Sequence, residues 1–311
     1  MIDEKLLEFL ACPICKSSVN EKGGGIVCSN TKCGKSFEII EGIPIMLANQ
    51  GEYEVDMEIT AKTWEKRYKQ VRDEYDPNNL PEVVKISSGY TKRFFELNDV
   101  EIEKIFLEAG CGTARTSLEL SKQKNLIIIC LDLSLSALLK ARQLFRKYTK
   151  QAYFICGDLR NLPILDTKID YIFSDGAIEH FKETQKAINE FYRILRKGGN
   201  VLVTVPHISF SMLSLGQLHG NIPNVVVLGH FLEFIHLRVL NGRFLKNGYE
   251  LSFTQAQLKR SFYEFTDVEV GLYQTFHELS WLRIKPLKEV IRKLTRNQLF
   301  CPLIYASCIK K

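Results

Sequence analysis

The sequence predicts an α/β protein in which a doubly wound sheet follows a small β-rich N-terminal module. Two observations predict the sheet. Apolar strand-like runs alternate with amphipathic helical runs from about residue 100 onward, and a glycine-containing bend joins the first such strand to its helix. A third observation, two closely spaced cysteine pairs near the start of the chain, predicts the small module.

The composition fits this organisation. Of the 311 residues, 45% are hydrophobic and 25% charged, as in ordinary globular proteins. The net charge of +6 permits an anionic partner without requiring one. We expect neither a signal peptide nor a membrane span, because no basic start precedes a long apolar run and every long apolar stretch is interrupted by charges. Nine cysteines in such a chain favour reduced thiols and a cytoplasmic location.

Four cysteines indicate a metal site within the first fifty residues. They fall as Cys12-x2-Cys15 and Cys28-x4-Cys33, with twelve residues between the pairs. Two short cysteine loops at the tips of two hairpins bring four thiolates to tetrahedral distance, which a closed structural Zn²⁺ site requires. Four unrelated buried cysteines are the alternative. Because so short a segment buries little core, we expect the metal to stabilise a zinc-ribbon domain over residues 1–50.

The segment that runs from "LLEFLACPIC" to "EGIPIML" resembles a family of small zinc-ribbon proteins. These proteins are activator subunits of tRNA, rRNA and release-factor methyltransferases. The similarity covers about residues 1–48 and includes both cysteine pairs. In that family the ribbon covers an apolar edge of its catalytic partner, so the resemblance implies that this ribbon docks on its own chain.

Residues 51–311 are predicted to form the sheet domain. A helix over residues 60–75 places Trp64 and Tyr68 on one face, and a second helix lies near residues 90–97. Continuous apolar strands separated by helices of about 10–15 residues then predict a parallel sheet covered on both faces. These segments are strand 104–110, helix 113–123, strand 126–134, helix 136–148, strand 152–158, strand 169–176, helix 183–199 and strand 200–206.

The bend after the first strand predicts a ligand site, because such sheets bind ligands at the carboxyl ends of their strands. Gly110 and Gly112 keep side chains away from a ligand that approaches the backbone. Asp132 ends the second strand, where an acidic residue can hold ribose hydroxyls. A dinucleotide site would have a third glycine where Ala114 stands, and Glu108 would repel a pyrophosphate. The charges of S-adenosylmethionine, which carries a sulfonium and an ammonium group, fit this loop better.

Five motifs resemble those of class I S-adenosylmethionine-dependent methyltransferases over about residues 60–311. They are "LEAGCGTART", "CLDLS", "CGDLRNLPI", "SDGAIEHF" and "RILRKGGNVLVTVP", of which the last two look most like the menaquinone and ubiquinone methyltransferase branch. The resemblance implies a seven-stranded Rossmann-like sheet whose closing strand, within "LIYASCIKK", is antiparallel. Two positions depart from the family pattern: Glu108 stands where aspartate is commoner, and Ala114 where the third glycine usually lies.

The resemblance also implies a set of cofactor-binding residues. They are Glu108, Gly110 and Gly112 at the methionine moiety, Asp132 at the ribose with Leu133 beside it, Asp158 and Leu159 at the adenine, and Ser174 beneath the sulfonium. Capping of a turn is the alternative role for Asp158.

Two histidines are the candidates for catalysis. His180 belongs to the "SDGAIEHF" motif, where it can serve as scaffold or as base, and His207 lies two residues past the end of the fifth strand. Residues 207–250 form an insertion that we expect to act as a substrate lid. A surface or helix-capping role is the alternative for His207. Methyl transfer from a sulfonium depends mainly on in-line placement within about 3–3.5 Å, so a base is needed only for a hydroxyl or carbon acceptor.

Three functions remain open from the sequence. The favoured one is a methyltransferase that acts on a small-molecule or lipid-linked acceptor. An RNA or protein methyltransferase is the alternative, although the fourth strand does not end in the Asn-Pro-Pro-Tyr-like motif used on amide or exocyclic amino nitrogens. A binding scaffold that has lost activity is the third, and the intact Gly110, Gly112 and Asp132 argue against it.

The basic C-terminus suggests a further partner. Residues 283–311 hold eight Lys or Arg against one acid, and "RIKPLKEVIRKLTRNQL" predicts an amphipathic helix. Such a helix can rest on an anionic membrane or on nucleic acid, or it can pack its apolar stripe on the domain and leave its charges solvated.

Overall fold

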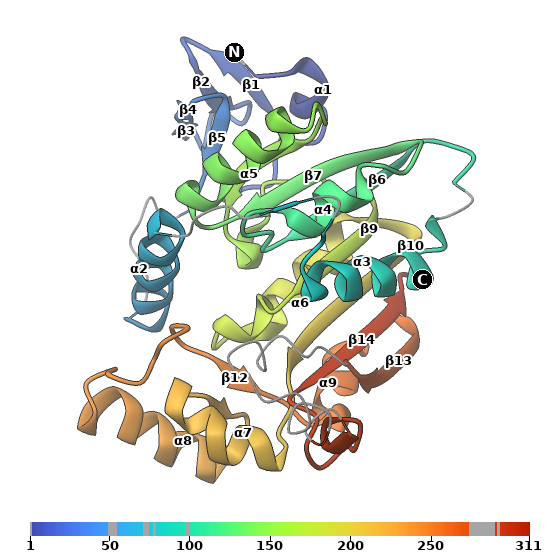
Figure 1. The fold of residues 1–311 in the computed structure, drawn as a ribbon. Coiled ribbons are helices and arrows are strands. Elements are labelled where there is room, and N and C mark those ends of the chain that lie inside the picture. Colours follow the sequence, from blue (N-terminus) through green and yellow to red (C-terminus); the bar gives the residue numbers. More distant parts are fainter. Residues whose placement is uncertain are drawn as a thin grey trace.

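The computed structural model describes residues 2–48, 55–70, 75–76, 79–97, 100–273, 290 and 293–311, and it confirms the predicted α/β architecture (Figure 1). Seven strands form the central sheet in the spatial order β13-β14-β10-β9-β6-β7-β8. Neighbours among β6 to β10 run parallel, whereas β14 is antiparallel to both β10 and β13, as expected for the closing strand. The bounds are β6 Lys104–Ala109, β7 Leu126–Asp132, β8 Tyr153–Gly157, β9 Ile169–Asp175, β10 Leu195–Pro206, β13 Thr266–Leu272 and β14 Leu303–Ile309.

Alternate residues of the central strands point into two separate cores, one on each face of the sheet. In β6, Ile105 and Leu107 belong to one buried cluster and Phe106 to the other. Both faces are apolar because both are covered by helices, as in other doubly wound sheets. The helices on the Phe106 face are α3 Glu82–Phe94, α4 Arg115–Leu120 and α5 Leu135–Lys147, and those on the opposite face include α6 Thr184–Ile194 and α9 Gln255–Ser261.

Several helix boundaries differ from the prediction. α2 spans Val55–Gln70 where 60–75 is predicted, and α3 spans Glu82–Phe94 where 90–97 is predicted. Two further shifts have a backbone cause. α4 begins at Arg115, because the preceding Ala114 has a left-handed φ of 52° that ordinary helix backbone does not adopt. α6 ends at Ile194, and the residues from Leu195 onward already belong to β10. A register shift between Leu195 and Asn200, next to Gly198 at φ 74°, lets this long strand begin early.

The ribbon contributes two strands to the large sheet, which the sequence did not indicate. β1, β2 and β3 form their own antiparallel sheet, but β5 pairs in parallel with β8 through Ile45–Cys156 and Met46–Gly157. With β4 beyond β5, the large sheet has nine strands. The expectation that the ribbon docks on its own chain is therefore confirmed. Its elements are α1 Glu4–Leu7, β1 Val19–Lys22, β2 Gly25–Cys28, β3 Ser36–Phe37, β4 Ile39–Ile40 and β5 Ile43–Met46.

The contact between ribbon and sheet domain is a continuous core. Leu10 is fully buried and forms an isolated β-bridge with Ile164. Nearby, the Lys16 ammonium lies 2.8 Å from the Glu190 carboxylate of α6. The boundary predicted near residue 50 falls between residues 48 and 55, outside the described residues, and the division into two domains stays a prediction.

The insertion after β10 lies at the end of the molecule opposite the ribbon (Figure 1). It begins with α7 Phe210–Ser214 and continues through η4 Leu215–His219, β11 Ile222–Pro223, α8 Val226–Phe234 and η5 Ile235–Val239. Its end is tied back where β12, Leu251–Ser252, pairs with β11. Most of the predicted basic C-terminal helix lies outside the described residues. In the described part of the chain, no helix is both long and apolar enough to cross a membrane.

Replacement of Leu10 by alanine tests the shared core. Because Leu10 is 0% exposed, Leu10→Ala should lower the free energy of unfolding by about 2–5 kcal/mol. The matched control is Ile14→Ala in the same ribbon, whose side chain is 44% exposed. Denaturant unfolding followed by circular dichroism and tryptophan fluorescence should give one shifted transition. Equal effects of the two substitutions, or a separate ribbon transition, would contradict a common core.

Candidate cofactor site and metal cluster

The chain between β6 and α4 adopts a bend that excludes side chains. Gly110 and Gly112 have φ angles of 81° and 53°. A Cβ atom on Gly110 would lie 2.4 Å from the Cβ of Ala177, and one on Gly112 would lie 2.4 Å from the hydroxyl of Tyr68. Both positions therefore require glycine for the backbone angle and for the space.

The Asp132 carboxylate holds this bend against the end of β7. Its two oxygens accept hydrogen bonds from the backbone amides of Gly112, at 2.7 Å, and of Ser134, at 2.8 Å. The amide of Gly110 donates to the carbonyl of Leu131 at 2.8 Å. Burial raises the pKa of Asp132 to about 6, so the side chain is mostly ionised at neutral pH.

A cavity of about 160 Å³ opens at the carboxyl ends of the central strands. Helix α2, Val55–Gln70, closes it from outside with Trp64 and Tyr68, whose rings stack 5.6 Å apart. This volume is below the about 300–1,000 Å³ of typical ligand pockets. A nucleoside ligand therefore requires α2 or its aromatic side chains to move outward. The predicted site residues that line the cavity are Gly110, Asp132, Leu133, Asp158, Leu159 and His180.

Four predicted site residues do not line this cavity. Gly112 lies under Tyr68, and Ser174 is fully buried in β9. The Glu108 carboxylate turns to the start of α4, where it accepts a hydrogen bond from the Ser117 amide at 3.0 Å. Burial raises the pKa of Glu108 to about 8. Its predicted contact with the methionine moiety stays a prediction.

His207 also lies elsewhere. Its Nδ1 atom is 3.1 Å from the carbonyl oxygen of Cys301. The residue lines a separate hollow together with Phe210 and Leu299. The structure thus does not bring His207 to the cavity, because the ring turns toward the strand that closes the sheet.

The His180 side chain faces the cavity, and two contacts hold it in one orientation. Its Nδ1 atom lies 2.6 Å from the carbonyl oxygen of Tyr249, and its ring packs edge-on against Trp64 with centroids 5.5 Å apart. Since a carbonyl only accepts hydrogen bonds, Nδ1 must carry the proton and Nε2 is left as an acceptor. Burial lowers the pKa of His180, so the imidazole is neutral near pH 7. This geometry serves either a scaffold or a base.

Asp158 caps a turn, which is the role that the sequence left open as the alternative to cofactor binding. The residue also lines the cavity. Its carboxylate accepts a hydrogen bond from the Arg160 amide at 2.8 Å and pairs with the Arg160 guanidinium, also at 2.8 Å. It thereby begins the short 3-10 helix η2, Leu159–Asn161.

Helix α2 is the part of the site that the sequence did not reveal. The Glu65 carboxylate accepts hydrogen bonds from the hydroxyls of Ser134 and Ser136, which ties α2 to the turn between β7 and α5. The Thr60 hydroxyl accepts a hydrogen bond from the Tyr249 amide at 2.9 Å, which ties α2 to the insertion. The spacing of Trp64 and Tyr68 predicted one aromatic face, but no local pattern indicates that this face covers the cavity.

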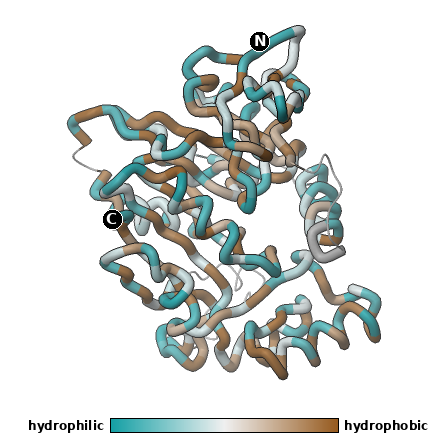
Figure 2. Tube along the Cα trace, turned by 180° about the vertical axis from the view of Figure 1, so that it is seen from behind, coloured by the Kyte–Doolittle hydropathy of each residue, from teal (hydrophilic) through white to brown (hydrophobic). Residues whose placement is uncertain are grey.

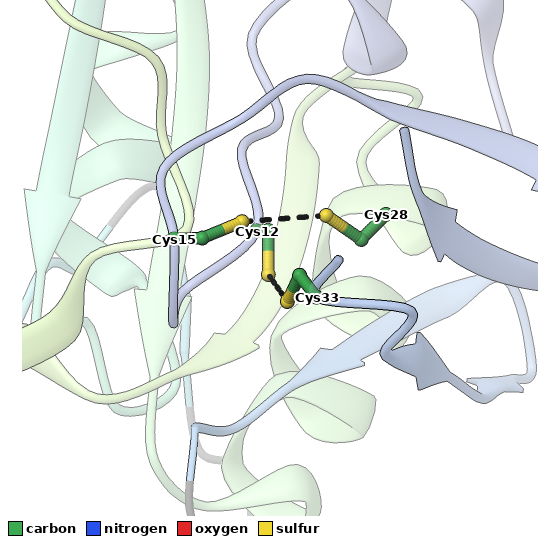
Figure 3. Close-up of side chains that lie close together, drawn as sticks. All are labelled: Cys12, Cys15, Cys28 and Cys33. Atoms are coloured by element: carbon green, nitrogen blue, oxygen red, sulfur yellow. Dashed lines mark hydrogen bonds between the residues drawn. The ribbon is translucent and has the colours of Figure 1, made fainter. Parts of the chain in front are cut away.

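The four ribbon cysteines converge on one point (Figure 3). One sulfur atom of each residue lies within 4.8 Å of all the others, and the Cys12–Cys33 and Cys15–Cys28 pairs are 3.7 and 3.4 Å apart. A tetrahedral Zn²⁺ ion with bonds of about 2.3 Å places its sulfur ligands about 3.8 Å apart. The cluster fits a structural zinc ion, and its four thiolates leave no coordination position for a substrate.

Comparison with known families finds two matches. Residues 107–203 match the family model described as "Methyltransferase domain", and residues 3–42 match the one described as "Trm112p-like protein". Part of the sheet domain is thus similar to a methyltransferase domain, and the ribbon is similar to a Trm112p-like protein.

The methyltransferase domain has curated relatives. The malonyl-[acyl-carrier protein] O-methyltransferase of Hamiltonella defensa is 40% identical over 112 residues, which are 36% of this chain and 39% of that protein. The enzyme of the same name from Yersinia pestis is 30% identical over 149 residues, 47% of this chain and 52% of that protein. The matches thus span about half or less of these relatives.

A solved structure shares the fold. The PH0226 protein from Pyrococcus horikoshii OT3 aligns with a TM-score of 0.52 at 15% sequence identity, over 79% of this chain and 99% of that one.

The charge of the residues that line the cavity suits a cationic nucleoside. Its described lining residues include Asp132, Asp158 and Asp175 but no Lys or Arg, so a phosphate-bearing ligand finds no counter-charge. The aromatic rings of Trp64 and Tyr68 suit a sulfonium through cation–π attraction. The buried Nε1 of Trp64 has no hydrogen-bond partner among the described residues.

Loss of one zinc ligand should weaken the Trm112p-like ribbon and the whole fold with it. We expect Cys28→Ser to lose bound zinc and about 3 kcal/mol of stability, which lowers the melting temperature by about 4–5 °C. Elemental analysis and thermal unfolding with and without a chelator measure both effects. The control Cys308→Ala removes a buried thiol outside the cluster and should keep the zinc. Full zinc content in Cys28→Ser would rule out this ligand set.

Proposed function

We propose that this protein transfers the methyl group of S-adenosylmethionine to a small-molecule or lipid-linked acceptor. The observation that carries the proposal is the acidic, aromatic-covered cavity at the bend between β6 and α4. When bound, the cofactor supplies an electrophilic methyl group, and the chain's own residues bind, orient and enclose the reactants.

The proposed cofactor-binding set is narrower than the one implied by resemblance. Asp132 offers its carboxylate to the ribose hydroxyls, as its position at the end of β7 favours. Asp158 and Leu159 line the adenine end at β8. Gly110 and Gly112 let the ligand approach the backbone. Gly112 also acts through its backbone amide, which donates a hydrogen bond to the Asp132 carboxylate. Glu108 acts indirectly, because it fixes the start of α4.

Asp175 lies on the acceptor side of the proposed site. It ends β9 and lines the cavity, and its oxygens accept hydrogen bonds from the hydroxyls of Ser87, at 2.8 Å, and of Thr204. This fixed negative charge favours the sulfonium, and His180 holds the nearby wall through Tyr249. A carboxylate or thiolate acceptor needs no base, so His180 then acts as a scaffold.

The names of the relatives support an acyl acceptor. Malonyl-[acyl-carrier protein] O-methyltransferases methylate an oxygen of a carrier-linked acyl group, as their name states. An acceptor of this class is our proposal for this chain too. The ribbon by itself does not favour an RNA or protein acceptor, because residues such as Leu10 and Val19 are buried in the core shared with the sheet domain. A cytoplasmic location stays a prediction.

The decisive experiment uses methyl-labelled S-adenosylmethionine with fractionated cell extract and with malonyl-loaded carrier protein. Label should enter the small-molecule, lipid or carrier-linked fraction. Gly110→Ala should reduce transfer about tenfold to hundredfold, because overpacking of this kind costs about 1–3 kcal/mol. Gly24→Ala is the matched control, since Gly24 has a similar φ of 79° but no atom within 4 Å of the added Cβ.

Two results would contradict the proposal. Label that enters only RNA or protein side chains would favour a macromolecular acceptor. Equal transfer by Gly110→Ala and Gly24→Ala would show that the bend does not hold the cofactor.

A further inference from the structure

Helix α8 consists mostly of apolar residues, yet almost none of them is buried. Its sequence is VVLGHFLEF, and Gly229 is its only buried residue. Val226 and Val227 are 76% and 81% exposed, and Phe231 and Phe234 are 59% and 58% exposed. Single exposed apolar residues are ordinary, but a whole exposed apolar helix is not.

Gly229 explains why these side chains face outward. A Cβ atom at this position would lie 2.5 Å from the carbonyl oxygen of Pro223, so the helix rests on β11 through its bare glycine backbone. At 100° per residue, Val227 and Phe231 each lie about 200° from Gly229 around the helix axis. Phe234 follows on the same face at the i+7 spacing from Val227.

Neighbouring elements extend this face. Phe210 and Leu213 of α7, and Leu215 and Leu218 of η4, are between 42% and 66% exposed. The hydrogen bond between His236 of η5 and Gln217 of η4, at 3.1 Å, holds the two halves of the insertion together. We call the combined face the apolar lid surface; it comprises Phe210, Leu213, Leu215, Leu218, Val226, Val227, Phe231, Phe234 and Val239. In Figure 2 the insertion is an apolar end of the molecule, remote from the ribbon.

The exposed charges of the insertion are mostly positive. Residues 207–250 contain Arg238, Arg243 and Lys246 and two acids, Glu233 and the buried Glu250. The three basic residues are exposed, whereas Glu233 pairs with Lys182 at 2.9 Å. A projecting apolar face flanked by exposed cations has the chemistry of a segment that lies in the headgroup region of an anionic bilayer.

We propose that the apolar lid surface docks the protein on an anionic lipid bilayer. Val227, Phe231 and Phe234 insert among the lipid chains, and Arg238, Arg243 and Lys246 contact the lipid phosphates. The basic residues of the surface would repel each other across a symmetric dimer. This inference concerns attachment and does not rest on the proposed reaction.

Docking at this surface brings the bilayer close to the acceptor side of the cavity. The Lys182–Glu233 ion pair joins α8 to the segment that follows His180, and Tyr249 at the end of the insertion contacts His180 directly. A lipid-linked acceptor would therefore reach the site from the membrane through the insertion.

Vesicle flotation of the full zinc-loaded chain tests the proposal. The protein should float with phosphatidylcholine vesicles that contain phosphatidylglycerol, and binding should weaken with salt and with neutral lipid alone. The double variant Phe231→Ser/Phe234→Ser should bind at least about tenfold more weakly, since it removes two inserted side chains. The control Tyr263→Ser alters a side chain that is 65% exposed outside the insertion and should bind as the unaltered protein does.

A second variant tests the charges. Arg238→Gln/Arg243→Gln should remove the preference for anionic over neutral vesicles while the fold, measured by circular dichroism, stays unchanged. The proposal is overturned if the protein does not float with anionic vesicles, or if Phe231→Ser/Phe234→Ser floats as well as Tyr263→Ser. A third result would also overturn it: light scattering shows that the unaltered protein is a dimer that does not bind vesicles, and only Phe231→Ser/Phe234→Ser makes this dimer dissociate. A second copy of the chain would then cover the surface.

Discussion

The hydrogen bond from the Gly112 amide to the Asp132 carboxylate joins two parts of the chain that the cofactor site needs together. It forms only because β6 and β7 are parallel neighbours whose register pairs Ala109 with Leu131, so that both strands end at the same level. The bend that presents the amide requires positive φ at Gly110 and Gly112, and a side chain at either position would collide with Ala177 or Tyr68. A carboxylate that accepts two backbone amides is fixed in position before any ligand arrives, so binding does not have to order it.

The ribbon is part of the large sheet and not a separate appendage. Its strand β5 lies against β8, and Met46 pairs with Gly157, the residue directly before Asp158. The metal cluster therefore stabilises a strand that supports the edge of the sheet where Asp158 and Leu159 line the cavity. A ribbon that acts on a separate partner would leave its apolar face open, whereas here Leu10 and Ile26 are fully buried.

The sequence predicted correctly those features that depend on residues close to each other in the chain. Strand and helix periodicity, cysteine spacing and the glycines of the bend each report on a few adjacent residues, and these predictions agree with the structure. The pairing of β5 with β8 could not be predicted, because a four-residue strand does not specify a partner more than a hundred residues away. Strand alternation places Glu108 on the same face of the sheet as Phe106, toward α4. This alternation could have predicted that Glu108 does not line the cavity. The position of α2 depends on side-chain contacts of Glu65 and Thr60 that no periodic pattern contains.

The central claim is that the Asp132 carboxylate binds the cofactor, and calorimetric titration with S-adenosylhomocysteine across pH tests it most directly. Because burial raises the pKa of Asp132 to about 6, protonation should remove the acceptor just below neutrality. The affinity should be constant above about pH 7 and fall by up to about tenfold per pH unit below about pH 6. Asp132→Asn should bind weakly at every pH. Tight binding by Asp132→Asn, or an affinity that does not change between about pH 8 and pH 5.5 while the protein stays folded, would contradict the account.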